Sequence, residues 1–524
     1  MQQILIAGQW RDANSSGSFQ ASNPATREPL AEEYPVSTWE DCDAALTAAA
    51  EATVALRSIS GSQIADFLEA YATEIENNAD AIVDVAHAET AYPKPTRLAG
   101  GELPRTTDQL RQAANAARTG NWSVPTIDTN AGIRSQYGAI GPVAVFGPNN
   151  FPLAFGSISG GDFAAAIAAG NPVIAKANSS HPGTTELFAR CAHQAAQNTG
   201  MPAGMVQLIY RTSHADGERL VADARIGATG YTGSRRAGLQ LKAAADAAGK
   251  PIYLELSSVN PVVILPQAME QQHEEIATEF TSSCLLGTGQ FCTNPGLVVV
   301  LKSDATDSFI AALSDQFSEA PVGTLLSSGV EKSLESNLNI LVAAGAKIVV
   351  GNASADSDRY CYANTLLQVT AQQFIADPET MQTEAFGNSS LLVVAESMDE
   401  VNAVIACFEG NLTGCIYSAT DGSDDAAYDQ IAANLQSKVG RMLNDKMPTG
   451  VAVSAAMNHG GPFPATGHPG FTAVGIPGSL LRFAMLQCYD NIRHDRLPVS
   501  LSDENSNGEL WRCVDGNWTR ENIS

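Results

Sequence analysis

Basic residues are scarce in this sequence, in which 30 Lys and Arg stand against 56 Asp and Glu and the net charge at pH 7 is −26. A chain with this excess repels nucleic acid and anionic membranes, so we expect neither as a partner. The acidic residues are spread along the chain rather than collected in a tail, which is typical of a solvated surface. Any site for an anionic cofactor or substrate must therefore supply its own Arg or Lys.

Long apolar runs and paired cysteine motifs are also missing. No run of about eighteen apolar residues occurs, and the start of the chain has neither the basic flank nor the apolar stretch of a signal peptide. We therefore expect no membrane span and a cytoplasmic location. The nine cysteines form no CxxC or Cys/His cluster, which predicts free thiols in a reduced compartment and no metal site.

Length and pattern, by contrast, are informative. The 524 residues, 44% of them hydrophobic, can bury a large core in two or three domains. Between residues 141 and 256, short apolar strands alternate with helical segments, which predicts a parallel α/β sheet covered by helices on both faces. Before that stretch we expect helices over 38–58, 62–78, 81–90 and 101–119, the first with a capping pattern at Thr38, and then a protruding hairpin over 121–140.

The first candidate for chemistry is Cys292, which lies in a turn-rich segment just before the apolar run Leu297–Leu301. A thiol held on a loop by glycines and proline is where a reactive nucleophile would be placed. A lone cysteine is, however, commonly a small buried hydrophobe. The residues alone leave both interpretations open.

Loops at the carboxyl ends of the expected strands contain what a nucleotide cofactor needs. Gly230, Gly233 and Ser234 stand at a strand-to-helix turn, where free amides can face a phosphate, although such a turn can also be purely structural. Lys176 and Arg211 end neighbouring strands and can converge on a second phosphate. These two basic residues would provide the positive charge that the acidic surface lacks.

Five motifs in order resemble those of the aldehyde dehydrogenase superfamily. They are Pro148–Pro152 (PNNFP), Gly230–Ser234 (GYTGS), Leu254–Ser258 (LELSS), Gly289–Cys292 (GQFC) and Glu384–Gly387 (EAFG). The resemblance extends over nearly the whole chain from about Ile6. Four further stretches, 147–155, 181–184, 459–466 and 510–516, look like the NADP-linked α-ketoglutarate semialdehyde (2,5-dioxovalerate) dehydrogenase branch of that superfamily.

The resemblance implies an α/β fold with a Rossmann-type cofactor domain, an α/β catalytic domain and a β oligomerisation arm. The cofactor domain would comprise 1–120 and 140–256, with 463–489 returning to it, and the catalytic domain 257–462. The segments 121–139 and 490–524 would form the arm and tail. A homodimer or homotetramer follows from the same resemblance.

The resemblance also implies NAD(P)-dependent oxidation of an aldehyde to a carboxylate. Cys292 would form the thiohemiacetal and then the thioester, while the Asn150 side chain and the Cys292 amide hold the oxyanion. Glu255 would be the general base for hydrolysis. Glu384 would bind the cofactor at the nicotinamide ribose and Lys176 at the adenosine ribose, and Phe386 would also be a cofactor-binding residue.

Two departures from the family pattern affect the cofactor. Ser179 stands where NAD-preferring members commonly carry a glutamate, and a hydroxyl can donate to a 2′-phosphate that a carboxylate would repel. Ser179, Lys176 and Arg211 therefore favour NADP, with NAD possible. Asn388 stands where the family commonly has proline, and we expect it to loosen the loop after Glu384.

The substrate prediction starts from the carboxylate of α-ketoglutarate semialdehyde, which would be oxidised to 2-oxoglutarate. The expected helix 101–119 places Arg105, Gln109 and Gln112 on one face, and we take Arg105, with Gln109 one turn on, as the carboxylate site. Arg105 can instead pair with Glu102 as an ordinary helix residue.

Three alternatives stay open, and one of them, a catalytically silent structural or binding protein on this fold, is disfavoured by the intact set Cys292, Glu255 and Asn150. Phe151, Phe155 and Phe463 can line an apolar tunnel, which would favour a long-chain or general aliphatic aldehyde oxidised with NADP. A cysteine hydrolase would share Cys292 and its neighbours but would not need the cofactor loops. Turnover of an aldehyde without nicotinamide cofactor would distinguish the hydrolase.

Overall fold

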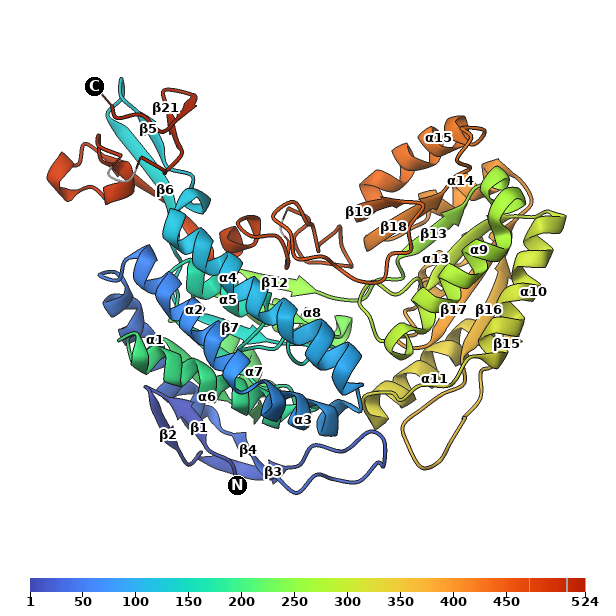
Figure 1. Ribbon diagram of the computed structural model, residues 1–524, viewed down its shortest axis with the longest axis horizontal. Helices are drawn as coiled ribbons and strands as arrows, with labels where there is room; N and C mark the ends of the chain where they lie inside the picture. The colour runs from blue at the N-terminus through green and yellow to red at the C-terminus, as the bar shows by residue number, and fades with distance from the viewer. Residues whose placement is uncertain (471, 506–507, 524) are drawn as a thin grey trace.

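The computed structural model describes residues 1–470, 472–505 and 508–523. Two lobes lie side by side, and an arm that carries the C-terminus projects beyond the first lobe (Figure 1). Among the described residues, no helix is both long enough and apolar enough to cross a bilayer.

The first lobe is built on a sheet with strand order β12-β11-β7-β8-β9-β1-β2. Its strands are β1 (Ile4–Ile6), β2 (Gln9–Arg11), β7 (Val143–Phe146), β8 (Val173–Lys176), β9 (Val206–Ile209), β11 (Ala228–Thr232) and β12 (Ile252–Glu255). From β12 to β9 all neighbours are parallel, whereas β1 is antiparallel to β9 and β2. The predicted parallel α/β sheet is confirmed, and its carboxyl ends point to one edge.

The first four helices of this lobe lie where the sequence predicts them, within a few residues at each end, and four more alternate with the strands of the sheet. They are α1 (Trp39–Leu56), α2 (Gly61–Asn77), α3 (Ala79–Thr90), α4 (Leu103–Thr119), α5 (Gly161–Ala168), α6 (Pro182–Asn198), α7 (His214–Ala222) and α8 (Arg235–Ala247). Thr38 is the N-cap residue of α1, as its capping pattern predicts, but its side chain makes no cap hydrogen bond. At α2 a capping box is formed, in which Ser60 and Gln63 bond reciprocally.

A short sheet of order β10-β4-β3 lies beside the first lobe. It contains β3 (Ser15–Phe19), β4 (Tyr34–Ser37) and β10 (Arg211–Thr212). Because β10 pairs in parallel with β4, Arg211 is held against Val36 directly after β9. This pairing fixes the backbone of a predicted cofactor residue.

The second lobe has a seven-stranded sheet of order β15-β16-β17-β14-β13-β18-β19, parallel except at β15. Its strands are β13 (Pro261–Ile264), β14 (Leu297–Leu301), β15 (Lys347–Val350), β16 (Thr365–Thr370), β17 (Ser389–Ala395), β18 (Asn411–Tyr417) and β19 (Val439–Asn444). Its helices are α9 (Pro266–Leu285), α10 (Asp304–Glu319), α11 (Ser328–Ala343), α12 (Ala371–Ala376), α13 (Pro378–Met381), α14 (Met398–Ala406) and α15 (Asp425–Leu435). Val262 and Val263 pack into cores on opposite faces, so the central strands are apolar throughout.

The arm is a five-stranded sheet of order β20-β6-β5-β21-β22. Its strands are β5 (Thr126–Asp128), β6 (Ile133–Ala139), β20 (Ala484–Asp490), β21 (Arg512–Val514) and β22 (Asn517–Thr519). The predicted hairpin is confirmed by the antiparallel β5–β6 pair. The predicted arm boundary at residue 490 is wrong, because β20 pairs with β6 along its whole length from Ala484.

The segment between β19 and β20 crosses back to the first lobe (Figure 1). Thr466 forms a β-bridge with Glu255, and Leu256 donates its backbone N–H to Ala465 at 2.8 Å. Further on, Arg482 pairs with Asp162 at 2.6 Å, and Phe483 is buried in the first lobe's core. The returning segment therefore completes the end of β12, where the site lies.

Candidate active site

Cys292 follows a tight turn after α9, in which Gly287, Thr288 and Gly289 all have positive φ. A Cβ atom on Gly289 would lie only 2.0 Å from the carbonyl oxygen of Gly387, so this position requires glycine. The Asn260 side chain holds the Cys292 carbonyl at 2.9 Å. The turn and this bond fix the backbone of the cysteine, whose side chain remains partly exposed.

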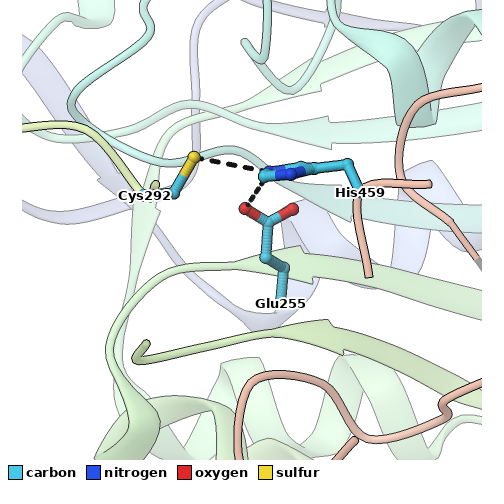
Figure 2. Close-up of side chains that lie close together, drawn as sticks. All are labelled: Glu255, Cys292 and His459. Carbon is cyan, nitrogen blue, oxygen red and sulfur yellow. Dashed lines mark hydrogen bonds and ion pairs between the residues drawn. The ribbon is translucent and has the colours of Figure 1, made fainter. Parts of the chain in front are cut away.

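Figure 2 shows Cys292, His459 and Glu255 converging on one point. His459 Nε2 lies 3.3 Å from Cys292 Sγ and 2.8 Å from Glu255 Oε1. Glu255 is the last residue of β12, and its Oε2 is buried without a hydrogen-bond partner. The three ligand atoms lie within 4.8 Å of one another, near enough for a single metal ion to bridge them, although the sequence predicts no metal.

The charge of His459 is set by these two neighbours. Burial alone would lower the pKa of the imidazole, but the negative charges of Glu255 and Cys292 and its hydrogen bonds to both outweigh burial and raise the pKa to about 10. The ring is therefore an imidazolium at neutral pH. A thiolate on Cys292 would have a cation directly beside it.

Asn150 lies at the start of the Asn150–Pro152 loop and is buried. Its side-chain Nδ2 donates to the Gln290 carbonyl at 2.9 Å. The backbone carbonyl of Asn150 accepts from Tyr92 Oη at 3.1 Å and from Arg97 Nη2 at 3.0 Å. Nδ2 carries two hydrogens, so one N–H is left for an oxyanion. The loop that would stabilise the oxyanion is thus held from both sides.

Arg97 links the two lobes at this loop. Its guanidinium lies 4.0 Å from the Phe151 ring centre and 4.5 Å from that of Phe291, and it pairs with Glu102 at 3.0 Å. Arg97 and Glu102 belong to the π-helix η1 (Lys94–Glu102) that precedes α4. Sequence periodicity gave no indication of this element or of its role.

A cavity of about 1250 Å³ opens from Cys292 toward the carboxyl ends of the first-lobe strands. Its walls contain the three predicted catalytic residues and all but one of the predicted cofactor residues, namely Asn150, Lys176, Ser179, Arg211, Gly233, Ser234, Glu255, Cys292, Glu384 and Phe386. The exception is Gly230, where an added Cβ would lie 2.6 Å from Asp162 Oδ2. Gly230 therefore serves packing within the lobe.

The polar groups of the cavity fit a dinucleotide. Burial and the charge of Arg211 lower the pKa of Lys176 to about 8, and both side chains line the same cavity. At the other end, burial raises the pKa of Glu384 to about 7, opposed by hydrogen bonds from Ser257 and Ser258. The N-terminus of α8, capped by Ser234, opens into the same space.

Comparison with known proteins decides the family. Residues 10–461 match the model of the aldehyde dehydrogenase family. The chain belongs to this family. The two-lobed fold is thus that of an aldehyde dehydrogenase (Figure 1), and family membership brings NAD(P)-dependent aldehyde oxidation with it.

The similar proteins include two named semialdehyde dehydrogenases. Alpha-ketoglutaric semialdehyde dehydrogenase 2 of Azospirillum brasilense is 38% identical over 96% of both chains, and the alpha-ketoglutaric semialdehyde dehydrogenase of Acinetobacter baylyi is 35% identical over the same shares. Among solved structures, aldehyde dehydrogenase C from Pseudomonas syringae, a mutant in complex with NAD+ and octanal, is 19% identical with a TM-score of 0.81. That match covers 93% of this chain and 96% of the other. At this identity the structural match shows the fold alone.

The three residues predicted to share a face of α4 contact three different parts of the structure. Arg105 Nη1 donates to the Val451 carbonyl, and Gln109 is buried with its Nε2 on the Ala154 carbonyl at 3.0 Å. Gln112 turns away and bonds Asp108 at 2.9 Å. The alternative partner of Arg105 is occupied, because Glu102 forms its ion pair with Arg97.

The predicted aromatic tunnel is only partly formed. Phe151 and Phe155 are in contact, with ring centres 5.3 Å apart, and Phe291 joins them at 5.1 Å from Phe151. Phe463 is 53% exposed and instead lies beneath Arg235, so its assignment to the tunnel is wrong. Guanidinium groups cover the other rings, since Arg105 lies 5.2 Å from the Phe155 centre.

The loop after Glu384 is also tighter than predicted. Asn388 is buried, and its Nδ2 donates to the Tyr362 carbonyl and to Asn364 Oδ1, each at 2.8 Å. Its backbone carbonyl accepts from Thr365 at 2.9 Å. Asn388 anchors this loop to β16 rather than loosening it.

His459 is the functional residue that the sequence analysis missed. It is 167 residues from Cys292 and 204 from Glu255, and it lies in an irregular segment without periodic pattern. The signal available was a histidine directly before a Gly-Gly-Pro turn, in a motif noted only for its resemblance to one branch.

Proposed function

We propose that this aldehyde dehydrogenase oxidises α-ketoglutarate semialdehyde to 2-oxoglutarate, with NADP preferred over NAD. The supporting observation is Arg105, whose Nε and Nη2 are buried without hydrogen-bond partners, while Cys292 and Glu255 are both near enough to act on its charge. Nε and Nη2 form the edge of a guanidinium that binds a carboxylate bidentately. The names of the Azospirillum and Acinetobacter relatives agree with this substrate.

The reaction begins at Cys292. His459, held as an imidazolium by Glu255, stabilises the thiolate that attacks the aldehyde carbon. The aldehyde oxygen becomes an oxyanion that takes the free N–H of Asn150 and the backbone N–H of Cys292. A nicotinamide cofactor in the adjoining cavity would supply the hydride acceptor, leaving a thioester on Cys292.

Glu255 completes the reaction as general base. Its Oε1 is engaged by His459, whereas its Oε2 makes no hydrogen bond and can take a proton from the water that attacks the thioester. Hydrolysis releases the carboxylate product and restores the thiolate. One carboxylate thus orients the imidazolium and activates the water through different oxygen atoms.

Three further assignments belong to the proposal. Lys176, Arg211 and Ser179 would hold the 2′-phosphate of NADP, and Glu384 with Phe386 would contact the nicotinamide ribose. The arm would join chains into a homodimer or homotetramer. Arg105, with Gln109 supporting its helix against Ala154, would bind the substrate carboxylate.

The test compares substrates in the wild type and in Arg105→Ala. We expect kcat/KM for α-ketoglutarate semialdehyde to fall by a factor that corresponds to roughly 2 kcal/mol of lost transition-state stabilisation, the scale of a lost charged hydrogen bond. The value of kcat/KM for uncharged pentanal should change little. Arg118→Ala is the control, because it lies on the same helix but pairs with Asp66 and Glu69 at the surface. Equal losses on both substrates would mean that Arg105 only supports the fold.

An aliphatic aldehyde is the second candidate, favoured by the contacts among Phe151, Phe155 and Phe291. The Pseudomonas syringae structure was solved with octanal, but its identity to this chain supports only the fold. The buried, unpartnered edge of Arg105 argues against a long apolar chain in the same place. A wild-type enzyme that prefers octanal over the semialdehyde would establish this alternative.

A further inference from the structure

A second arginine approaches the nucleophile from the other lobe. Arg441 lies on β19, in register with Thr413 of β18. The Thr413 hydroxyl bonds Asn260 Oδ1 at 3.0 Å, and Asn260 in turn holds the carbonyl of Cys292. This chain of contacts places Arg441 beside the turn that carries the catalytic thiol, and the charge of Cys292 acts on its guanidinium.

Arg441 and Arg105 converge on the same short loop, Pro448–Val451. Both Nη atoms of Arg441 donate to the Gly450 carbonyl at 3.1 Å, and Nη1 of Arg105 donates to the next carbonyl, that of Val451. The backbone N–H of Gly450 donates to Thr293 Oγ1 at 3.1 Å, adjacent to Cys292 in sequence. Two cations from different lobes therefore meet on consecutive carbonyl groups next to the nucleophile.

Neither arginine has an anionic partner. Within the described part of the chain, no carboxylate lies within ion-pair distance of Arg105 or Arg441. Nε and Nη2 of Arg105 and Nε of Arg441 are buried and make no hydrogen bond. Three buried donors on two neighbouring cations are unfavourable in the empty protein, and an anion that accepts from all three removes that cost.

We propose that Arg441 and Arg105 together form the subsite for a 2-oxo carboxylate, with Arg441 as a specificity-determining residue of the enzyme. The inference rests on the proposed function and extends it to a second residue. A 2-oxo carboxylate presents three oxygen atoms at one end of the substrate. The Arg105 edge holds the two carboxylate oxygens, and Arg441 Nε donates to the 2-oxo oxygen.

The experiment compares three aldehydes of equal chain length in the wild type and in Arg441→Gln. These are α-ketoglutarate semialdehyde, 5-oxopentanoate, which lacks only the 2-oxo group, and pentanal, which also lacks the charge. We expect kcat/KM to fall about 30-fold for the first, less for the second and less than about twofold for pentanal. Pentanal thus reports any damage to the loop that Arg441 supports.

Binding is measured separately from turnover, with 2-oxopentanoate as the probe. This anion should protect Cys292 of the wild type from alkylation by iodoacetamide, whereas Arg441→Gln should need roughly tenfold more of it. Arg441→Lys keeps the charge and the stem but has no Nε–H at that place, so it should lose protection by 2-oxopentanoate while keeping the wild-type melting temperature.

The outcomes separate this inference from the proposed function. If the wild type does not prefer α-ketoglutarate semialdehyde over pentanal, the proposed function fails. If the wild type shows that preference but Arg441→Gln lowers all three substrates equally or leaves all three unchanged, only the assignment of Arg441 fails. Unchanged protection by 2-oxopentanoate in both variants would overturn it independently.

Discussion

His459 presents one nitrogen atom, Nε2, to both Cys292 Sγ and Glu255 Oε1. A single N–H cannot point directly at two acceptors, so its shorter contact, to Glu255, is the hydrogen bond that orients the ring. Cys292 then experiences the imidazolium mainly as a nearby positive charge. This arrangement places a positive charge beside Cys292 Sγ and leaves the second oxygen of Glu255 without a hydrogen bond.

The pH dependence of thiol reactivity tests this role. The folded-state pKa of His459 is raised to about 10, above its ordinary value, so the ring stays charged from pH 6 to 9 and its charge is lost only as the pH rises through 10. Because the imidazolium favours the thiolate, we expect iodoacetamide to alkylate Cys292 faster in the wild type than in His459→Gln at pH 6. The two rates should converge as the pH rises and the imidazolium loses its charge, which rate profiles of both proteins from pH 6 to 10 would measure.

Two cysteine variants control the assignment of the signal. Cys292→Ala should abolish rapid alkylation and aldehyde oxidation, whereas Cys407→Ala, which removes another partly exposed thiol, should change neither. A His459→Gln profile that superimposes on the wild-type profile would show that His459 does not stabilise the thiolate.

At the level of elements, the strand ends were predictable and the irregular segments were not. Lys176 and Arg211 could be placed at one sheet edge because parallel strands alternate with helices in a recognisable pattern. His459 lies in an irregular segment whose course depends on distant tertiary contacts, such as the bridge from Thr466 to Glu255. The hydrophobic periodicity of a sequence reflects local structure and does not indicate contacts between distant segments.

The proposed preference for NADP can be tested at one of these predicted strand ends. Because the 2′-phosphate is present only in NADP, Arg211→Ala should raise KM for NADP by a factor that corresponds to roughly 1 to 3 kcal/mol of lost binding free energy. The KM for NAD should change far less. Arg236→Ala removes another exposed cation from the same cavity and should have the smaller effect on the ratio. Steady-state kinetics with each cofactor measure these KM values. Equal changes in KM for NADP and for NAD would show that Arg211 does not bind the 2′-phosphate.

Lys176 adds a pH dependence to the same measurement. Its folded-state pKa is lowered to about 8, so its charge is complete well below pH 8 and is lost as the pH rises through that value. The advantage of NADP over NAD should therefore shrink between about pH 7 and pH 9.

For the whole molecule, the arm carries the prediction about assembly. β20 is an edge strand of the arm sheet, and Met485 and Leu486 on it are 48% and 58% exposed. An exposed apolar edge is suited to pairing with another chain. We expect the wild type to be a dimer or tetramer in light scattering, and Leu486→Glu to shift it toward monomer.

Val54→Glu is the matched control for the arm, because Val54 is 62% exposed on α1, away from the arm. It should leave the mass unchanged. A wild-type monomer, or an unchanged mass for Leu486→Glu, would exclude β20 as the contact between chains.

The returning segment also determines when the first lobe can be finished during synthesis. Phe483 fills that lobe's core and Arg482 pairs with Asp162, yet both follow the entire second lobe in the chain. A ribosome that has translated residues 1–256 has therefore released a lobe whose core is still incomplete. The residues of the second lobe must be synthesised before the chain can return, so the last contacts of the first lobe form late and join residues of very long sequence separation.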